Sequence, residues 1–199
     1  MKYPAIAEQI IQLKNDDLAL RDRLIEDGIL SNGYHKEMEA LHILNAQSLE
    51  NIIDDIGFPT ISKVGKEGNA ATWLIIQHAI SLPPFMMKCA ALLSEAVEQN
   101  EASPMHLAYL QDRIAVFQGE VQLYGTQFDW DEEGLMSPEP YDDLDHVNKR
   151  RASMGLSSLD EQTVVMRARA VEEKESPPSD YAKRKMEKDE WSRSVGWTK

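Results

Sequence analysis

Residues 69–80, NAATWLIIQHAI, decide how the rest of the chain has to fold. Their apolar side chains point in almost every direction around a helix, which predicts a helix buried on all sides. These apolar residues are Trp73, Leu74, Ile75, Ile76, Ala79 and Ile80. We expect Asn69 at the N-cap of this helix, and a connecting loop with Gly65 and Gly68 over residues 60–68 before it. The remaining elements must therefore pack around this segment.

Gln77 and His78 are two adjacent polar side chains near the end of this apolar stretch. Burying such groups without hydrogen-bond partners costs roughly 1–3 kcal/mol each. The sequence therefore predicts that other elements bring polar partners to them.

The composition indicates an acidic protein that can build a core. The chain has 199 residues, 42% of them hydrophobic, and 21 Lys and Arg against 34 Asp and Glu give a net charge of −13. That charge argues against binding to nucleic acid or to an anionic membrane.

No apolar run is long enough to span a bilayer, and the first residues do not resemble a signal peptide. With Cys89 alone there is no intrachain disulfide, so we expect a cytoplasmic protein.

Apolar periodicity predicts a mainly α fold, a multi-helix single domain with one small β-hairpin and a C-terminal extension. Further helices are expected near residues 4–27, 35–56, 84–99, 103–119, 142–155 and 159–173. Gly28 and Asn32-Gly33 are expected to end the first of these helices and to turn the chain. Residues 1–175 are assigned to the helical domain. Residues 176–199 are assigned to a charged, aromatic-bearing tail, either partly disordered or docked.

The stretch 121–136 breaks the helical pattern and predicts the hairpin. Residues 121–128 are strand-like, and a turn is expected near residues 131–134. Gly125 permits a bend that would present neighbouring polar side chains on a fixed loop. These side chains are Tyr124, Thr126 and Gln127.

Residues 129–145 contain eight acids and no base, which is typical of a solvated acidic rim. Their first residues copy the opening of a calcium loop, but Pro140 stands where a bidentate acid is required. The five scattered histidines and the single cysteine show no zinc-ligand spacing. We therefore predict no metal and no cofactor.

Several polar residues fall on the apolar faces of the predicted helices. Asn45 lies in the middle of the stripe of the second helix, His42 lies at its edge, and Asp17 interrupts the stripe of the first. Asp112 and Arg113 are adjacent on a helix that is apolar almost all round. Buried charges need partners. A structural ion-pair network and a functional site both remain open as interpretations of this pair.

Several motifs together resemble a bacterial domain family of unknown function over about residues 40–160. They are Asn45-x-x-x-Leu49, Gly57-Phe58-Pro59, Gln77-His78-Ala79, Asp112-Arg113 and Tyr124-Gly125-Thr126-Gln127. The resemblance implies that these polar residues recur as one set, and it implies no particular reaction. In the family pattern acidic residues follow the Gln-His-Ala element. Here Ile80 and Leu82 stand in those places, and Met86 replaces a glutamine.

The first functional hypothesis is an enzyme that acts on a small polar or anionic substrate. His78 would be the general acid/base, Asp112 its orienting partner or a second base, and Arg113 the group that holds an anion. The substrate-binding candidates are Asn45, Gln77, Tyr124, Thr126 and Gln127. No strong nucleophile is evident, so hydrolysis or transfer through an activated water is the expected chemistry.

Two alternatives remain open. The chain could be a non-catalytic binding or immunity-type module that uses the acidic hairpin or the C-terminal tail against a basic protein partner. The family-pattern acids that are missing after His78 favour this alternative. The same polar residues could also form a buried network that only specifies helix packing.

Overall fold

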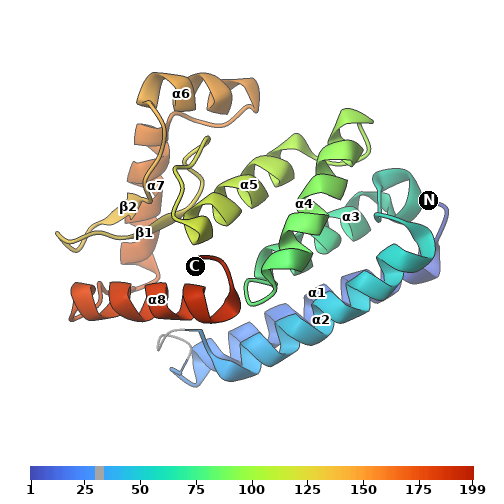
Figure 1. Cartoon of the computed structure of the whole chain (residues 1–199), viewed down its shortest axis with the longest axis horizontal. Helices are drawn as coiled ribbons and strands as arrows, with labels where there is room; N and C mark the ends of the chain where they lie inside the picture. Colours follow the sequence, from blue (N-terminus) through green and yellow to red (C-terminus); the bar gives the residue numbers. More distant parts are fainter. Residues whose placement is uncertain (30–33) are drawn as a thin grey trace. The chain divides into compact units, whose positions relative to one another are not determined.

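The computed structural model describes residues 1–29 and 34–199, which form eight helices and one two-stranded antiparallel hairpin (Figure 1). For these residues the prediction of a mainly α fold with one small hairpin is confirmed. The chain divides into two compact units, Met1–His106 and Leu107–Lys199. Each unit is described separately below.

The first unit contains α1 (Pro4–Glu26), α2 (Lys36–Ile56), α3 (Ile61–His78), α4 (Pro83–Glu98) and the first turn of α5 (Pro104–Gln118). α3 packs mainly against α1 and also against α2 and α4, while α1 and α2 lie alongside each other (Figure 1). Proline near the start of α1 and of α4 suits a helix N-terminus, because it has no N–H to leave unpaired. The fully buried apolar side chains here include Ile10, Leu24, Leu49, Val64, Ile75, Ile76, Met86 and Leu93.

The start of α3 differs from the sequence prediction. Residues 60–68 are not a connecting loop: α3 already begins at Ile61, and only Gly65 inside it departs from helical geometry, with φ 75° and ψ 171°. Glycine adopts a positive φ without steric cost, so the chain bends at one residue and continues as a helix. The prediction that Asn69 caps the helix is therefore wrong. Its buried side-chain amide instead donates a hydrogen bond to the carbonyl of Pro59.

The C-terminal half of α3 is buried over most of its surface, although Trp73, Leu74 and His78 are partly exposed. The helix ends at His78, two residues before the predicted end.

After α1, Gly28 has a φ of 70° and its N–H bonds to the carbonyl of Ile25, as expected of a residue that ends a helix. The predicted Asn32-Gly33 turn lies outside the described residues.

The second unit contains the rest of α5, then β1 (Phe128–Trp130), β2 (Met136–Pro138), α6 (Leu144–Ser153), α7 (Leu159–Glu172) and α8 (Tyr181–Val195). β1 and β2 pair with Asp129 opposite Ser137. One carboxylate oxygen of Asp131 accepts the N–H groups of Glu133 and Leu135 and so fixes the turn between the strands. The strand-like stretch predicted over residues 121–127 is not part of this hairpin, because its backbone groups bond to side chains, as described below.

The last two helices have caps that the sequence could supply locally. Ser158 and Glu161 form a capping box at the start of α7, and Asp180 caps α8. Beyond α8, the Trp197 side chain is only 6% exposed and stacks on Phe117, with ring centroids 5.3 Å apart. The C-terminal segment thus contributes apolar surface to the second unit.

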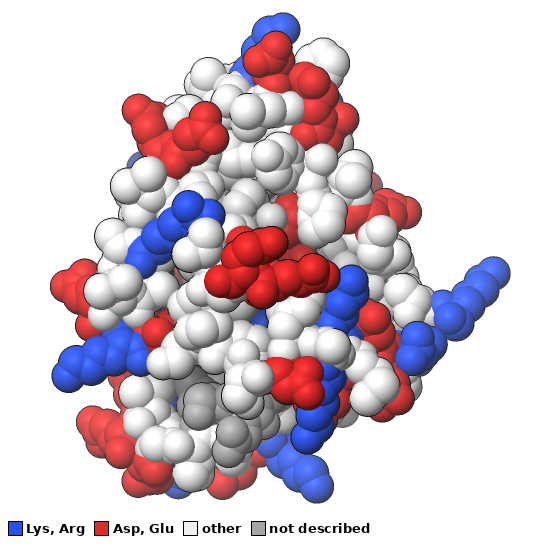
Figure 2. Space-filling model, turned by 90° about the vertical axis from the view of Figure 1, so that its left-hand side faces the viewer, with Lys and Arg blue, Asp and Glu red and all other residues white. Residues whose placement is uncertain are grey.

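Two surface properties bear on function. Figure 2 shows acidic side chains in several groups on the face that it draws, with basic side chains between them. Within the described residues, none of the helices has both the length and the apolarity needed to cross a bilayer.

Candidate functional site

Three polar side chains from three different helices meet in the core of the first unit. Asp17 of α1 is completely buried, His42 of α2 is 7% exposed, and the His78 side chain at the end of α3 is 26% exposed. Oδ2 of Asp17 lies 2.9 Å from Nδ1 of His78 and 3.1 Å from Nε2 of His42. We call these three residues the Asp17 cluster.

The helix periodicity explains why these side chains converge. Asp17 is seven residues, or about two turns, from both Ile10 and Leu24, and all three are buried on the same face of α1. His42 follows Met38 by one turn on the buried stripe of α2. The packing that buries the apolar stripes of α1, α2 and α3 therefore also brings the polar residues together.

The hydrogen atoms of the cluster can be assigned from its geometry. An ionised carboxylate only accepts hydrogen bonds, so Nδ1 of His78 and Nε2 of His42 both carry a hydrogen that faces Asp17. The hydroxyl of Tyr34 lies 2.6 Å from Nδ1 of His42 and donates to it when that imidazole is neutral. Burial, and secondarily the charge of Glu39, raises the pKa of Tyr34, so the hydroxyl keeps its proton. Tyr34, His42, Asp17 and His78 thus form one continuous set of polar contacts.

Asp17 is held in its charged form. Burial by itself would raise the pKa of this carboxyl, but the contacts with the imidazoles of His42 and His78 and their charges outweigh burial and hold the pKa well below its ordinary value of 3.8. The contact with His42 is short but poorly aligned for a hydrogen bond. Among the described residues Oδ1 of Asp17 has no hydrogen-bond partner. One oxygen therefore serves both imidazoles while the other is buried and unsatisfied.

His78 is the member of the cluster that solvent can reach. Its Nδ1 is committed to Asp17, so its Nε2 is the nitrogen that carries a lone pair toward a ligand. This is the arrangement of a histidine base held by a carboxylate. The Asp17 cluster could also hold a metal ion. Each of its three residues offers one ligand atom, and these three atoms lie within 4.8 Å of one another.

The two amide residues predicted on these helices are also buried in the first unit. The side-chain amide of Asn45 donates to the carbonyl of Leu13, 3.2 Å away, and so ties α2 to α1. Gln77 is 4% exposed and lies on α3 beside His78. The Asn45 bond gives that residue a structural role.

The other predicted site residues come together in the second unit, around Asp112 of α5. This completely buried carboxylate accepts the N–H groups of Leu123, Tyr124 and Thr126 at 2.8, 3.1 and 2.9 Å, and the Thr126 hydroxyl at 3.0 Å. Burial raises the pKa of Asp112, and these hydrogen bonds oppose the rise. Asp112 therefore acts as the template on which residues 123–126 fold.

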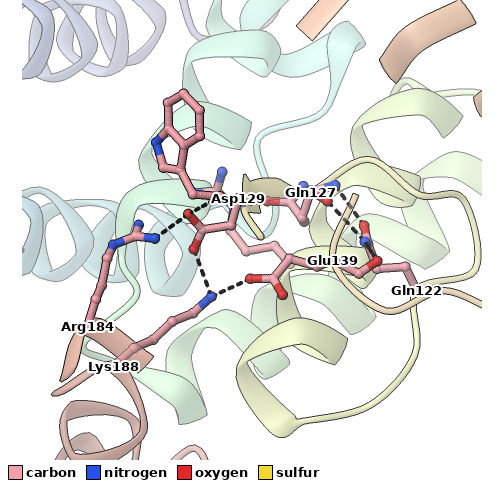
Figure 3. Close-up of polar contacts among 8 residues, drawn as sticks. Gln122, Gln127, Asp129, Glu139, Arg184 and Lys188 are labelled. Carbon is pink, nitrogen blue, oxygen red and sulfur yellow. Dashed lines mark hydrogen bonds and ion pairs between the residues drawn. The ribbon is translucent and has the colours of Figure 1, made fainter. Parts of the chain in front are cut away.

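Arg113 and two glutamines extend this network to the hairpin. Nε of Arg113 donates to Oε1 of Gln127, 3.1 Å away, and burial lowers the pKa of Arg113 to about 10. The completely buried side chain of Gln122 accepts the N–H of Gln127 and donates to the carbonyls of Gln127 and Glu139 (Figure 3). A guanidinium that keeps its charge near neutral pH is thus held beside the amide of Gln127.

Arg151 is a key residue of this network, although it was not among the predicted site residues. It is 2% exposed, and its guanidinium donates to the carbonyls of Tyr124, Gly125 and Ser157 at 2.9, 3.2 and 2.6 Å. Gly125 has a φ of 61°, and a Cβ there would meet Leu159 at 2.8 Å. The Tyr-Gly-Thr-Gln motif is thus a tight loop held by Asp112 on one side and Arg151 on the other.

The acids of the hairpin face bases of α8. Asp129 pairs with Arg184 at 2.6 Å and with Lys188 at 3.2 Å, and Lys188 also pairs with Glu139 (Figure 3). These acids are therefore neutralised within the second unit by the C-terminal helix.

The structure groups the predicted residues differently from the single constellation expected. His78 has Asp17 as its carboxylate partner, whereas Asp112, Arg113, Tyr124, Thr126 and Gln127 belong to the network of the second unit. The signal for Asp17 was visible in the sequence, since a lone Asp inside an apolar helical stripe needs a buried partner.

Comparisons with known proteins identify the family but no reaction. Neither curated proteins nor solved structures yielded a match to the chain. A family model matches residues 4–172, which cover nearly all of the first unit and the second unit through α7. The chain therefore belongs to DUF6624, a family of unknown function.

Proposed function

We propose that the first unit carries the active site of a hydrolase or transferase that works by general acid/base chemistry on a small polar or anionic substrate. His78 is the proton-transfer group and Asp17 orients it. The observation that carries the proposal is the hydrogen bond between Nδ1 of His78 and the fully buried Asp17, which leaves the lone pair on Nε2 of a side chain that is 26% exposed.

The chemistry follows from this geometry. Nε2 of His78 takes a proton from a water molecule or a substrate hydroxyl as its oxygen attacks the electrophilic centre. The resulting imidazolium is stabilised by the carboxylate of Asp17, and the Nδ1 hydrogen stays on the imidazole throughout. Nε2 then returns its proton to the leaving group, so no net charge is created over the cycle.

The polar residues of the second unit are assigned structural and ligand-binding roles, and none of them transfers a proton. Asp112 and Thr126 build the loop, whereas Arg113, beside Gln127, is the candidate for binding a carboxylate or phosphate within the second unit. A carboxylate or phosphate ligand that requires Arg113 would support this assignment.

The test is a thermal-shift screen of phosphorylated and carboxylated metabolites, followed by NMR detection of turnover for each compound that stabilises the protein. His78→Gln removes the imidazole and keeps a polar side chain, so turnover should fall by about 10²–10⁴-fold. His146→Gln, on the exposed surface of α6, is the matched control and should leave turnover unchanged. Equal turnover in His78→Gln and wild type would rule out the acid/base role. An unfolded His78→Gln together with an unfolded His78→Asn would assign the residue to structure.

The second candidate function is a binding module for a basic protein. Its support is the net charge of −13 and the separate groups of acids on the face drawn in Figure 2. Partner capture that weakens steeply with added salt would support it. Binding that is insensitive to salt would count against it.

A further inference from the structure

We propose that the Asp17 cluster binds a divalent transition-metal ion, with Zn²⁺ as the probe. The ligands are a carboxylate oxygen of Asp17, Nε2 of His42 and Nδ1 of His78. This inference goes beyond the acid/base proposal and does not depend on it, because ion binding is measured without any turnover.

Two of the three separations between the ligand atoms are close to those of a metal site, and all three are within 4.8 Å. Zn²⁺ binds imidazole nitrogen and carboxylate oxygen at about 2.0–2.2 Å, which places tetrahedral ligands about 3.3–3.6 Å apart. The Asp17 oxygen lies 2.9 and 3.1 Å from the two nitrogen atoms. Outward shifts of a few tenths of an ångström would therefore make room for an ion between them.

The unsatisfied oxygen of Asp17 is a second and independent observation. Oδ1 is buried and, within the described part of the chain, accepts no hydrogen bond. A buried carboxylate normally has its oxygens paired with donors or with a metal. An ion coordinated through Oδ1 of Asp17, alone or together with Oδ2, would remove this deficit.

Tyr34 supplies the outer contact that a histidine ligand usually has. When Nε2 of His42 binds an ion, its hydrogen moves to Nδ1, which then donates to the hydroxyl oxygen of Tyr34 across the same 2.6 Å contact. A hydroxyl can donate or accept, so the contact survives this change of tautomer. Such outer hydrogen bonds orient metal-binding histidines and raise their basicity.

The donor set suits an ion that has an exchangeable position. Two imidazoles and one carboxylate favour Zn²⁺, Fe²⁺ or Ni²⁺ over Ca²⁺ or Mg²⁺. Three protein ligands leave a fourth position for water, as in catalytic rather than structural zinc sites. The partly exposed side chain of His78 marks the side from which an ion would enter.

Ion binding and the base function of His78 are alternative states of the same residues. An ion on Nδ1 leaves the hydrogen of the neutral imidazole on Nε2, which then has no lone pair to accept a proton. The activation of water would pass from His78 to the metal-bound water, whose pKa is lowered by the ion. The cluster thus has two distinct ways of producing a nucleophile.

The experiment is a calorimetric titration of the chelator-treated full-length protein with Zn²⁺, and a parallel titration with Co²⁺ followed by its visible absorption. We expect one ion per chain, intense tetrahedral Co²⁺ bands, and a shift of the His78 tautomer from Nδ1–H to Nε2–H by long-range ¹⁵N NMR. His42→Ala and Asp17→Asn should each weaken Zn²⁺ binding by at least about 100-fold, beyond the effect of losing an outer contact. The control His146→Ala should bind like wild type.

Absence of stoichiometric Zn²⁺ binding by wild type would overturn the proposal, as would undiminished binding in folded His42→Ala. If His42→Ala does not fold, His42→Gln takes its place, since it keeps a polar side chain of similar reach. Loss of turnover in His78→Gln without any Zn²⁺ binding by wild type would refute the metal site and leave the acid/base function standing.

Discussion

Asp17 and Asp112 are both completely buried carboxylates, yet their surroundings are opposite. Asp112 accepts four hydrogen bonds from one loop, three of them from backbone N–H groups, and none of these donors titrates near neutral pH. Asp17 faces two imidazoles, and one of its oxygens has no donor among the described residues. The pKa is raised for Asp112, where burial prevails, and lowered for Asp17, where the imidazoles prevail. Fixed donors build structure, whereas titratable donors can exchange protons or yield to an ion.

The largest expected effect tests the structural half of this comparison. Asp112→Ala removes the acceptor of three N–H groups and one hydroxyl, each of which then lies unpaired in a buried loop. Because an unsatisfied buried donor costs about 1–3 kcal/mol, we expect a loss of unfolding free energy on the order of 3 kcal/mol or more. Chemical denaturation measures it, with exposed Asp189→Ala as the control. A loss below about 1 kcal/mol, within the range of an ordinary hydrogen bond, would contradict the template role of Asp112.

A smaller effect is expected at the other carboxylate. Asp17→Asn keeps the side-chain volume and can still accept one imidazole hydrogen through its oxygen, so the loss of stability should be only about 1–2 kcal/mol. The change should instead appear in His78, whose neutral tautomer should shift from Nδ1–H towards Nε2–H because the charged acceptor is lost. Long-range ¹⁵N NMR reports the tautomer. If Asp17→Asn destabilises the chain as much as Asp112→Ala while the His78 tautomer stays unchanged, the two carboxylates have the same structural role.

The smallest effect is expected at Asp129. Its side chain is 21% exposed, whereas those of Asp17 and Asp112 are completely buried. Burial opposes the shift, but Arg184 and Lys188 lower the pKa of Asp129 below 3.8. A lowered carboxyl pKa stabilises the folded state above the unfolded value and loses that contribution as the pH falls through the folded value. Docking of α8 should therefore persist to about pH 4 and weaken below it, by on the order of 1 kcal/mol or less. Tryptophan fluorescence would follow it, and Asp129→Asn should remove the transition. An unchanged transition in that variant would assign it to another group.

Local patterns were sufficient for much of the fold. Apolar periodicity located the helices, and the turn residues near 131–134 located the hairpin. The helical turn that precedes the kink at Gly65 was missed because a glycine that bends a helix and a glycine that ends one look alike in sequence. Helix α8 carries few apolar residues, so its sequence resembles that of a disordered tail. Its tertiary contacts, which include those with Asp129 and Phe117, distinguish it from one.

The candidate site was less accessible to sequence reasoning. Periodicity showed that Asp112, Arg113 and His78 needed partners, but it carries no information on which helices face one another. Asp17 is 25 residues from His42 and 61 from His78, so their convergence depends on long-range packing. Burial could therefore be predicted for single residues, whereas the pairing of Asp17 with two histidines required the folded chain.

The family match ends at residue 172, whereas the bases that face Asp129 and Glu139 lie on α8, at residues 181–195. A protein truncated at the family boundary would keep the hairpin but lose those cations. Two carboxylates on neighbouring parts of the hairpin would then repel each other, and the ring of Phe117 would lose the tryptophans that cover it. In a shortened chain of this kind the hairpin should be more stable in acid, where its carboxylates are protonated, than at neutral pH. The chain should also be more prone to self-association through its uncovered aromatic face. The boundary suggested by sequence similarity is thus not the boundary at which the second unit is self-sufficient.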